Sequence, residues 1–394
     1  MQAEGRLRGM EKRAMTIVFR ACVVMTVFVV SAVAINAQTL NNGGFEIGGG
    51  PYTNPATSLI STAAVSWVQF ATGYMADIAA LARLAYTKAY LLWGAINVLL
   101  WIVFQHVLRP YAQRPQHPYH YFFLCSLFFP LWAALIQGQT SVLLLALFAL
   151  TFAYARRGED FKAGVFLGLG LFKYALVIPF ALICLLRGKW RMMAGFAAAA
   201  FALGALSVIA VGPAGVQSYV KLMLDILSHP ENPLYADIKP LGMPTVTGFF
   251  AALFTGRLAL VYNNALGTTV SALLVLFTAL RWRQDDLGAN GNNSGLMFAA
   301  ALAASQVTAP YLYTHDMTLM LTPTLLVLGS SQWSRASTER RVLLAVILIL
   351  YTPPLYVAIL RWHMMYLLAP ALVIFALAAV SMATKPADEL AAGT

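Results

Sequence analysis

Residues 163–186 read AGVFLGLGLFKYALVIPFALICLL, and this stretch decides the fold. It is apolar throughout except for Lys173 and the adjoining Tyr174. Three glycines precede the lysine and Pro179 follows it. Glycine and proline both weaken a helix interior, and a charge at membrane depth needs a partner or a water-filled cavity. The stretch therefore predicts two apolar half-helices that meet near Lys173–Tyr174 within a bilayer.

The whole chain is strongly apolar. Hydrophobic residues make up 60% and charged residues 10%, with a mean hydropathy of +0.71, whereas a soluble domain carries roughly a quarter charged residues. Apolar runs of about 16–24 residues suit membrane helices better than barrel strands. We therefore expect an all-α polytopic membrane protein with about ten transmembrane helices plus a re-entrant helix pair. The expected spans are 15–36, 85–108, 120–137, 139–155, 190–211, 261–280, 295–310, 315–330, 342–360 and 366–383.

The basic residues predict which span ends share one side of the membrane. The net charge is +11, but the basic residues form short clusters with no interleaved aromatic stripe, so we expect no nucleic-acid partner. Loops rich in Lys and Arg stay in the cytoplasm, which predicts that both termini are cytoplasmic. We expect the membrane to be a bacterial inner (plasma) membrane. All clusters fall on one side if 163–186 enters the bilayer and returns without crossing. The clusters are Arg6/Arg8/Lys12/Arg13, Arg109/Arg114, Arg156/Arg157/Lys162, Arg187/Lys189/Arg191, Arg281/Arg283 and Arg335/Arg340/Arg341.

The N-terminal region differs from the rest. Residues 1–84 contain an apolar run that ends in Ala32-Val33-Ala34, a small-x-small pattern typical of secretory cleavage sites. A polar, Gly-rich stretch follows at 38–58. The region is interpreted either as a signal anchor with an external loop or as a fused or frame-disturbed start. We expect a transmembrane domain over 85–383 and a cytoplasmic tail over 384–394.

Lys173 and the neighbouring pair His315 and Asp316 are the main candidate site residues. At the tip of a broken helix the Lys173 ammonium could meet a phosphate, or it could snorkel to the nearer interface. His315 could bind phosphate or orient a sugar, while Asp316 could fix the imidazole tautomer or cap the next helix. The alternative is a plain helix cap beside an interfacial histidine.

Gln139, Tyr174 and Tyr313 are the other residues expected to line a cavity with Asp316. Gln139 begins an apolar span, so it either lines the site or caps the helix. There is no P-loop, HExxH or GxSxG motif, which leaves transporters and membrane-embedded transferases. The three cysteines have no CxxC spacing, and paired carboxylates are sparse, so we expect no zinc site and no obligatory divalent ion.

Three segments together resemble a known family. Residues 138–218 start with Gly-Gln, pass a basic turn and the Lys173 stretch, and reach a second basic turn and a Gly-Pro turn. WGAINVLL at 93–100 and SQVTAPYLYTHDMTLMLTP at 305–323 are similar to further segments of the same family. Over roughly 85–380 the chain resembles glycosyltransferase family 87, membrane enzymes of the GT-C class typified by polyprenyl-phosphate-mannose-dependent α-1,2-mannosyltransferases.

The resemblance implies transfer of a hexose, mannose in the type enzymes, from a polyprenyl-phosphate donor to a glycolipid or glycan acceptor on the non-cytoplasmic face. It implies that Lys173 and His315 contact the donor phosphate and that Gln139 lies near the cavity mouth, and it calls for no cofactor. The family places a catalytic carboxylate in the first external loop. Only Glu46 and Asp77 are acidic between the first two expected spans, and the family's "D…Y" pattern is not recognisable around them.

Two other functions compete with this one. A broken helix around Lys173 also suits a transporter or lipid-binding membrane protein, although no internal repeat supports that. A family member that lacks the catalytic carboxylate would keep the scaffold without the activity. The discriminating feature is a carboxylate within reach of Lys173 and His315.

Overall fold

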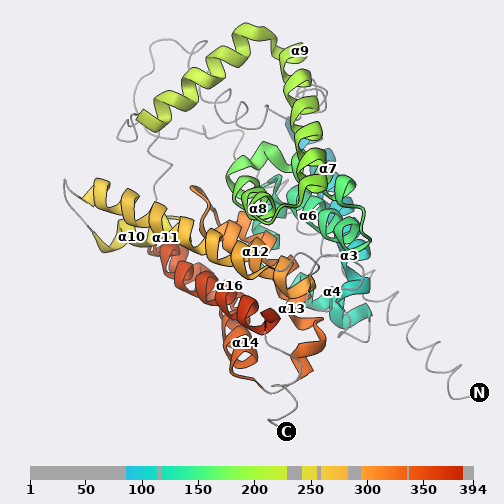
Figure 1. Ribbon diagram of the computed structural model, residues 1–394, viewed down its shortest axis with the longest axis vertical. Coiled ribbons are helices and arrows are strands. Elements are labelled where there is room, and N and C mark those ends of the chain that lie inside the picture. Colours follow the sequence, from blue (N-terminus) through green and yellow to red (C-terminus); the bar gives the residue numbers. More distant parts are fainter. Residues whose placement is uncertain are drawn as a thin grey trace, which may run out of the picture.

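The computed structural model describes residues 86–112, 118–228, 242–254, 259–282, 294–334 and 337–384. Within these residues the secondary structure is helical, with no strand (Figure 1). The expected span 15–36, the region 1–84 and residues 385–394 of the expected tail lie outside them. The helices are α3 (Tyr86–Leu108), η1 (Arg109–Tyr111), α4 (Pro118–Ser126), α5 (Phe129–Ile136), α6 (Ser141–Arg156), α7 (Asp160–Leu169), η2 (Gly170–Lys173), α8 (Tyr174–Leu186), α9 (Trp190–Ser228), α10 (Val246–Leu253), α11 (Ala259–Arg281), α12 (Ser294–Val307), η6 (Asp316–Met320), α13 (Leu321–Leu328), η7 (Ser331–Ser334), α14 (Thr338–Leu350), α15 (Pro353–Arg361), η8 (Met365–Leu367) and α16 (Leu368–Thr384).

The first of the two expected half-helices is α7. It runs antiparallel to α6, because Tyr154, late in α6, stacks on Phe166 with ring centroids 5.1 Å apart. Leu144, early in α6, lies against Gly170 at the far end of α7. The chain then tightens into the 3-10 turn η2, which ends at the expected break.

The second half-helix, α8, runs in the opposite direction to α7. Its start contacts the start of α6 through Lys173 and Ser141, and its middle contacts the middle of α6 through Phe180 and Phe148, whose centroids are 5.4 Å apart. These contacts make α6 and α8 parallel. Since α7 is antiparallel to α6, the pair α7 and α8 forms a hairpin with Lys173 at its tip.

The contacts of α9 show that the start of α7 and the end of α8 lie at the same level of the bundle. Gly164 of α7 lies against the backbone of Met192 in the first turn of α9, and the Lys189 N–H bonds to the Cys184 carbonyl at 3.1 Å. By length and composition alone Asp160–Leu186 qualifies as one membrane span of 27 residues. A straight helix of that length would separate its ends by ~40 Å, which these contacts exclude. The segment therefore folds back as two half-helices, which is the shape expected of the predicted re-entrant pair.

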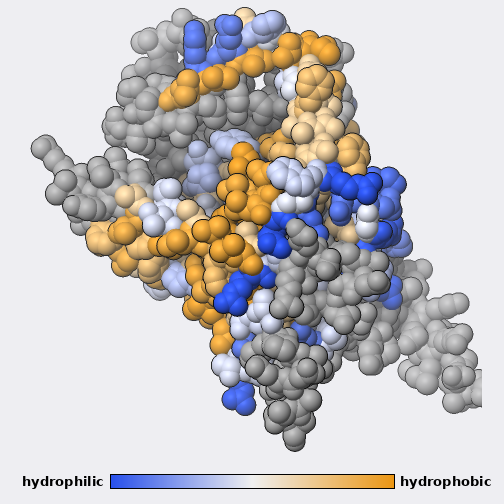
Figure 2. Space-filling model, in the orientation of Figure 1, coloured by the Kyte–Doolittle hydropathy of each residue, from blue (hydrophilic) through white to orange (hydrophobic). Residues whose placement is uncertain are grey.

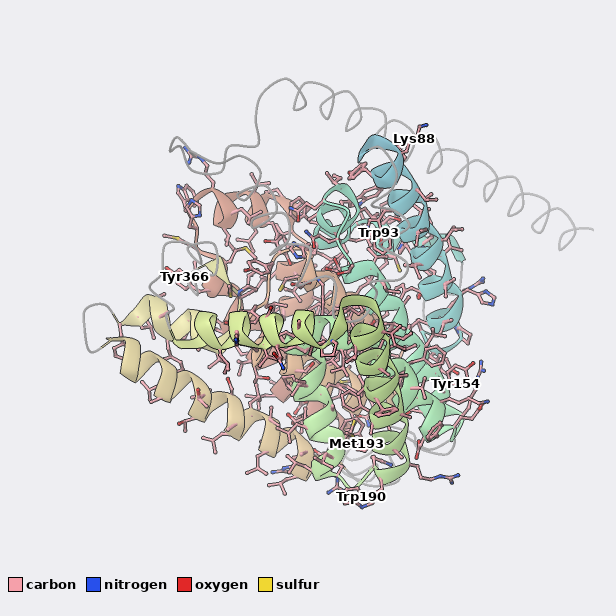
Figure 3. All side chains as sticks on the ribbon, turned by 90° about the horizontal axis from the view of Figure 1, so that it is seen from above. Lys88, Trp93, Tyr154, Trp190, Met193 and Tyr366 are labelled. Atoms are coloured by element: carbon pink, nitrogen blue, oxygen red, sulfur yellow. The ribbon has the colours of Figure 1, made fainter. Side chains whose placement is uncertain are left out.

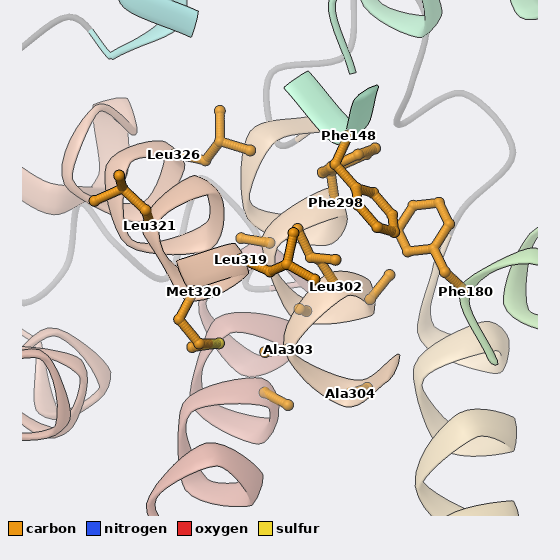
Figure 4. Packing of buried hydrophobic residues seen from close by; sticks show 14 of the residues in the cluster. Phe148, Phe180, Phe298, Leu302, Ala303, Ala304, Leu319, Met320, Leu321 and Leu326 are labelled. Atoms are coloured by element: carbon orange, nitrogen blue, oxygen red, sulfur yellow. The ribbon is translucent and has the colours of Figure 1, made fainter. Parts of the chain in front are cut away.

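The core lies between α6, α8, α12 and α13. The Phe180 ring lies 5.4 Å from Phe148 and 5.0 Å from Phe298 between centroids, and Figure 4 shows the three side chains beside Leu302. Almost every residue of α12 is buried. A helix that is apolar all round belongs at the centre of a bundle. The turn that follows α12, residues 308–315, is therefore fixed by a rigid central element.

The bundle has two distinct ends. In Figure 3 Tyr154, Trp190 and Met193 lie toward one end, and Trp93 and Tyr366 toward the other. The first is called the basic end, because the turns α6–α7 and α8–α9 lie there and carry basic residues in and beside them. These residues are Arg156, Arg157, Lys162, Arg187, Lys189 and Arg191.

Three expected segments differ in the structure. The expected span 120–137 is broken between α4 and α5, and 342–360 is bent by 62° between α14 and α15. Pro130 and Pro353 stand in the first turn of the second helix in each case, and the residues that precede these helices, Phe128 and Thr352, are extended. A proline is tolerated in the first turn of a helix but interrupts a helix that would continue through it. The stretch between the expected spans 190–211 and 261–280 is also partly helical, because α9 continues past Gly212 to Ser228 and α10 follows.

The described helices fit a protein embedded in a bilayer. By length and composition four segments could cross a membrane, or five if α14 and α15 form one span, and one of the four is the folded-back pair α7 and α8. The expected number of ten is therefore not confirmed. Figure 2 shows broad hydrophobic surface over α9 and α11. Phe201 and Ile209 of α9 are each 80% exposed. Contiguous exposed apolar surface is rare on soluble monomers and ordinary on lipid-facing helices.

Candidate functional site

The site is built on a glycine turn between α5 and α6. Gly138 has φ +61°, a left-handed conformation that favours glycine, and the Gln139 N–H bonds to the Ala134 carbonyl at 2.8 Å. The Trp93 indole N–H donates to the Gly138 carbonyl at 2.7 Å, which fixes the turn to α3. The turn therefore sets the position of Ser141, the first residue of α6.

Three polar side chains meet at this point from distant parts of the chain. The Ser141 hydroxyl donates to Oδ1 of Asp316 at 2.8 Å, and Nζ of Lys173 donates to Oγ of Ser141 at 2.9 Å. Lys173 and Asp316 also form a direct ion pair. The side chains of Lys173 and Asp316 are 16% and 7% exposed, and Ser141 is fully buried. A buried charge is stable only when it is paired and hydrogen-bonded. Here Lys173 and Asp316 balance each other's charge, and the Ser141 hydroxyl hydrogen-bonds with both.

The second carboxylate oxygen of Asp316 organises the turn after α12. The Tyr313 N–H donates to Oδ2 at 3.3 Å, and Nε2 of His315 lies 3.6 Å from the same oxygen. The Tyr313 and His315 rings stack with centroids 5.6 Å apart. Thr318 anchors the turn by donating to the His315 carbonyl at 2.7 Å. Asp316 thus accepts from residues before η6 and does not cap the helix that follows.

His315 lies in the turn between α12 and η6, and its side chain is 15% exposed. An imidazole ring carries at least one N–H donor in either of its protonation states, so the ring can donate a hydrogen bond to an anionic ligand.

The site lies well inside the bundle, away from the basic end. α8 has 13 residues between Lys173 and the basic end, which corresponds to about 20 Å at 1.5 Å per residue. The 16 residues of α6 give a similar ~24 Å for Ser141. The Lys173–Asp316–Ser141 cluster thus lies about 20–24 Å along these helices from the basic end.

The structure brings most of the expected site residues together. Lys173, His315, Asp316 and Tyr313 share direct contacts, as described above. Gln139 and Tyr174 are half-buried and lie close to the site in the sequence. Gln139 follows Gly138 in the turn, and Tyr174 begins α8 directly after Lys173. The two expected catalytic carboxylates, Glu46 and Asp77, lie outside the described residues.

Ser141 was not among the residues expected from the sequence. A serine in the first turn of an apolar helix looks like an ordinary polar helix start, and nothing local marks it. Among the described residues no three His, Cys, Asp or Glu side chains gather in an arrangement that could hold a metal ion.

A comparison with protein families identifies the fold's relatives. Residues 70–310, more than half of the chain, match the family model of glycosyltransferase family 87. The chain belongs to glycosyltransferase family 87. The family match includes Ser141 and Lys173 of the cluster and stops just before His315 and Asp316. No curated protein and no solved structure gives a significant match. Family 87 membership makes the protein a membrane glycosyltransferase, which uses a sugar donor and an acceptor.

Proposed function

We propose that this family 87 protein transfers a hexose, in the first instance mannose, from a polyprenyl-phosphate donor to a glycolipid or glycan acceptor. The reaction takes place at the non-cytoplasmic face of a bacterial inner membrane, with inversion at the sugar carbon, on a GT-C-type scaffold. The observation that carries the proposal is the Lys173 ammonium, fixed by Ser141 and Asp316 at membrane depth and still partly exposed. No cofactor or metal ion is required by this scheme.

The geometry suits a phosphate attached to a lipid. An ammonium has three N–H bonds, and the contacts of Lys173 with Ser141 and Asp316 account for two. The third can donate to a phosphate oxygen, and the His315 imidazole supplies a second donor nearby. The lipid tail would stay in hydrocarbon, so the site needs no nucleotide-binding fold.

The charge arrangement also suits the bond that breaks. The donor phosphodiester carries one negative charge, and the departing polyprenyl phosphate gains a second when the sugar–oxygen bond breaks. A fixed ammonium therefore interacts more strongly with the transition state than with the bound donor, which is the condition for rate enhancement. Because Asp316 holds the ammonium in place, little reorganisation is needed at that moment.

Asp316 does not fit the role of catalytic base. Its two oxygens accept from Lys173, Ser141 and the Tyr313 N–H, and it is an ion-pair partner in a buried position. The acceptor hydroxyl needs a carboxylate that is free to take a proton. We assign that role to Asp77 or Glu46, and the family match favours Asp77 because it begins at residue 70.

The test is transfer of radiolabelled mannose from polyprenyl-phosphate-mannose in membranes that contain the full chain. We expect wild type to transfer label, Lys173→Ala and His315→Ala to lose most transfer, and either Asp77→Asn or Glu46→Gln to abolish it. Lys162→Ala is the matched control, because Lys162 is a solvent-exposed lysine near the basic end that pairs only locally with Glu159. It should keep wild-type transfer.

Two outcomes would overturn the proposal. Wild type that transfers no label from any of several polyprenyl-phosphate sugars, while still binding the donor, would indicate a binding or transport protein. Transfer that survives Lys173→Ala unchanged would remove the cluster from the reaction. Retention of transfer by both carboxylate variants would show that the base lies elsewhere.

A further inference from the structure

The last part of α9 is a helical arm, residues 213–228, that the proposed reaction does not use. The backbone turns at Gly212, which has φ 72° and ψ 168°, and Pro213 follows. A left-handed glycine before a proline cannot continue a helix, because the proline lacks an N–H and its ring crowds the preceding turn. Figures 1 and 3 both show the arm leaving the direction of the first part of α9 sharply.

The bend falls where a membrane span ought to end. The first part of α9, Trp190–Ile209, has 20 residues and is apolar enough to cross a bilayer. Its length corresponds to ~30 Å, the thickness of the hydrocarbon layer. The span begins beside Arg187 and Lys189 at the basic end, so its other end, and the bend, coincide with the opposite membrane boundary.

The described residues of the arm are amphipathic. Val220 and Leu224, one helical turn apart, are 49% and 60% exposed. Gln217 and Lys221 form an adjacent exposed polar stripe with the same spacing. Figure 2 shows hydrophobic residues along the arm and hydrophilic residues gathered on its outer side.

We propose that the arm lies in the bilayer interface at the end of the α9 span, with Val220 and Leu224 in the acyl region and Gln217 and Lys221 among the head groups. An amphipathic helix with one apolar stripe and a basic residue on its polar side is the form that binds in this plane. The Lys221 stem can lie along the apolar side while its ammonium reaches lipid phosphates.

A second protein molecule is a poorer occupant of this face than lipid. The arm is continuous with a helix whose own apolar side chains, such as Ile209, are exposed over the length of a membrane span. Lipid can therefore cover the apolar surface of both parts of α9 without an additional protein partner.

The experiment measures the depth of four arm positions in reconstituted vesicles of phosphatidylcholine and phosphatidylglycerol. Single nitroxide labels are attached at Gln217→Cys, Val220→Cys, Lys221→Cys and Leu224→Cys in a full chain whose three native cysteines are replaced by alanine. Collision rates are recorded with oxygen, which concentrates in the acyl region, and with a water-soluble nickel chelate. Ile209→Cys and Lys162→Cys serve as lipid-facing and water-facing references.

We expect labels at 220 and 224 to favour oxygen over nickel by several-fold, close to the Ile209→Cys reference, and labels at 217 and 221 to favour nickel. Equal, high nickel collision at all four positions would place the arm in water and overturn the proposal. Shielding of all four from both reagents would overturn it too, because protein would then cover the arm. Circular dichroism of each labelled variant checks that the helices are intact. The sugar-transfer assay is not used here, so the outcome does not depend on the proposed reaction.

Discussion

Lys173 and Asp316 form a buried ion pair although 143 residues separate them in the chain. The pair joins the tip of the re-entrant hairpin to the turn after the central helix α12. Ser141 completes it from α6. One electrostatic contact therefore holds together three elements that pack through different faces of the core.

Removal of one charge from this pair should cost more than removal of both. Asp316→Leu leaves the Lys173 ammonium buried without a counter-charge, and the expected loss is about 3–5 kcal/mol of unfolding free energy. The double variant Lys173→Met/Asp316→Leu should recover much of that loss, because two apolar groups replace two charges. Thermal unfolding in detergent measures all three proteins. Equal stability of the single and double variants would contradict the pairing, and the double variant should remain inactive in sugar transfer.

Ser141→Ala should weaken the cluster but keep the ion pair between Lys173 and Asp316. The change removes one donor to Asp316 and one acceptor for Lys173, and we expect a loss of about 1–3 kcal/mol together with a clear drop in transfer rate. Thr151→Val is the matched control on the same helix, because the buried Thr151 hydroxyl has no hydrogen-bond partner among the described residues. That variant should be as stable as wild type or slightly more so. A Thr151→Val loss as large as that of Ser141→Ala would remove the special role of Ser141.

Gly138→Ala tests the turn that sets the start of α6. At φ +61° an alanine is strained, and we expect a loss of about 1–2 kcal/mol. Gly94→Ala is the opposite control, because Gly94 lies inside α3 and an added methyl group would meet no atom within 4 Å. That variant should gain about 0.5–1 kcal/mol from helix propensity. Thermal unfolding of both variants gives the answer, and the two shifts should have opposite signs.

Asn97→Leu tests whether a buried amide has been kept at the expense of stability. Asn97 is fully buried in α3, and neither side-chain atom has a hydrogen-bond partner among the described residues. Trp93, one turn earlier, bonds to Gly138, so Asn97 lies near the level of Ser141. We expect the leucine variant to unfold at a higher temperature, with an unfolding free energy about 1–3 kcal/mol larger than that of wild type. A rise in stability with loss of sugar transfer would assign the amide to the reaction, whereas lower stability would mean that a partner exists in the membrane.

The parts of the fold that depend on local chemistry were predictable from the sequence. Lys173 is conspicuous because charge in an apolar run is costly, and the glycines and Pro179 around it indicate a break. The hairpin followed from the basic residues at both of its ends. These signals lie within the segment concerned, so no tertiary information was needed.

The remaining parts depend on contacts between distant segments. Asp316 was interpreted as a possible helix cap because its partners, Lys173 and Ser141, are far away in the chain. Ser141 carries no local mark at all. The arm was expected to be loop because the Gly212–Pro213 pair does end the span, and the helix that resumes after it is stabilised by an environment that hydropathy averages do not describe.

The hairpin of α7 and α8 has a consequence for how the protein is inserted during synthesis. If residues 160–186 were released into the bilayer as one straight segment, the turn at Arg187–Lys189 would emerge on the far side, and every later helix would be inverted. The close fit of Gly164 against Met192 is possible only in the folded-back form. Whether residues 160–186 fold as a hairpin or as a straight helix thus determines the orientation of more than half of the polypeptide. It also determines the side of the membrane on which His315 lies.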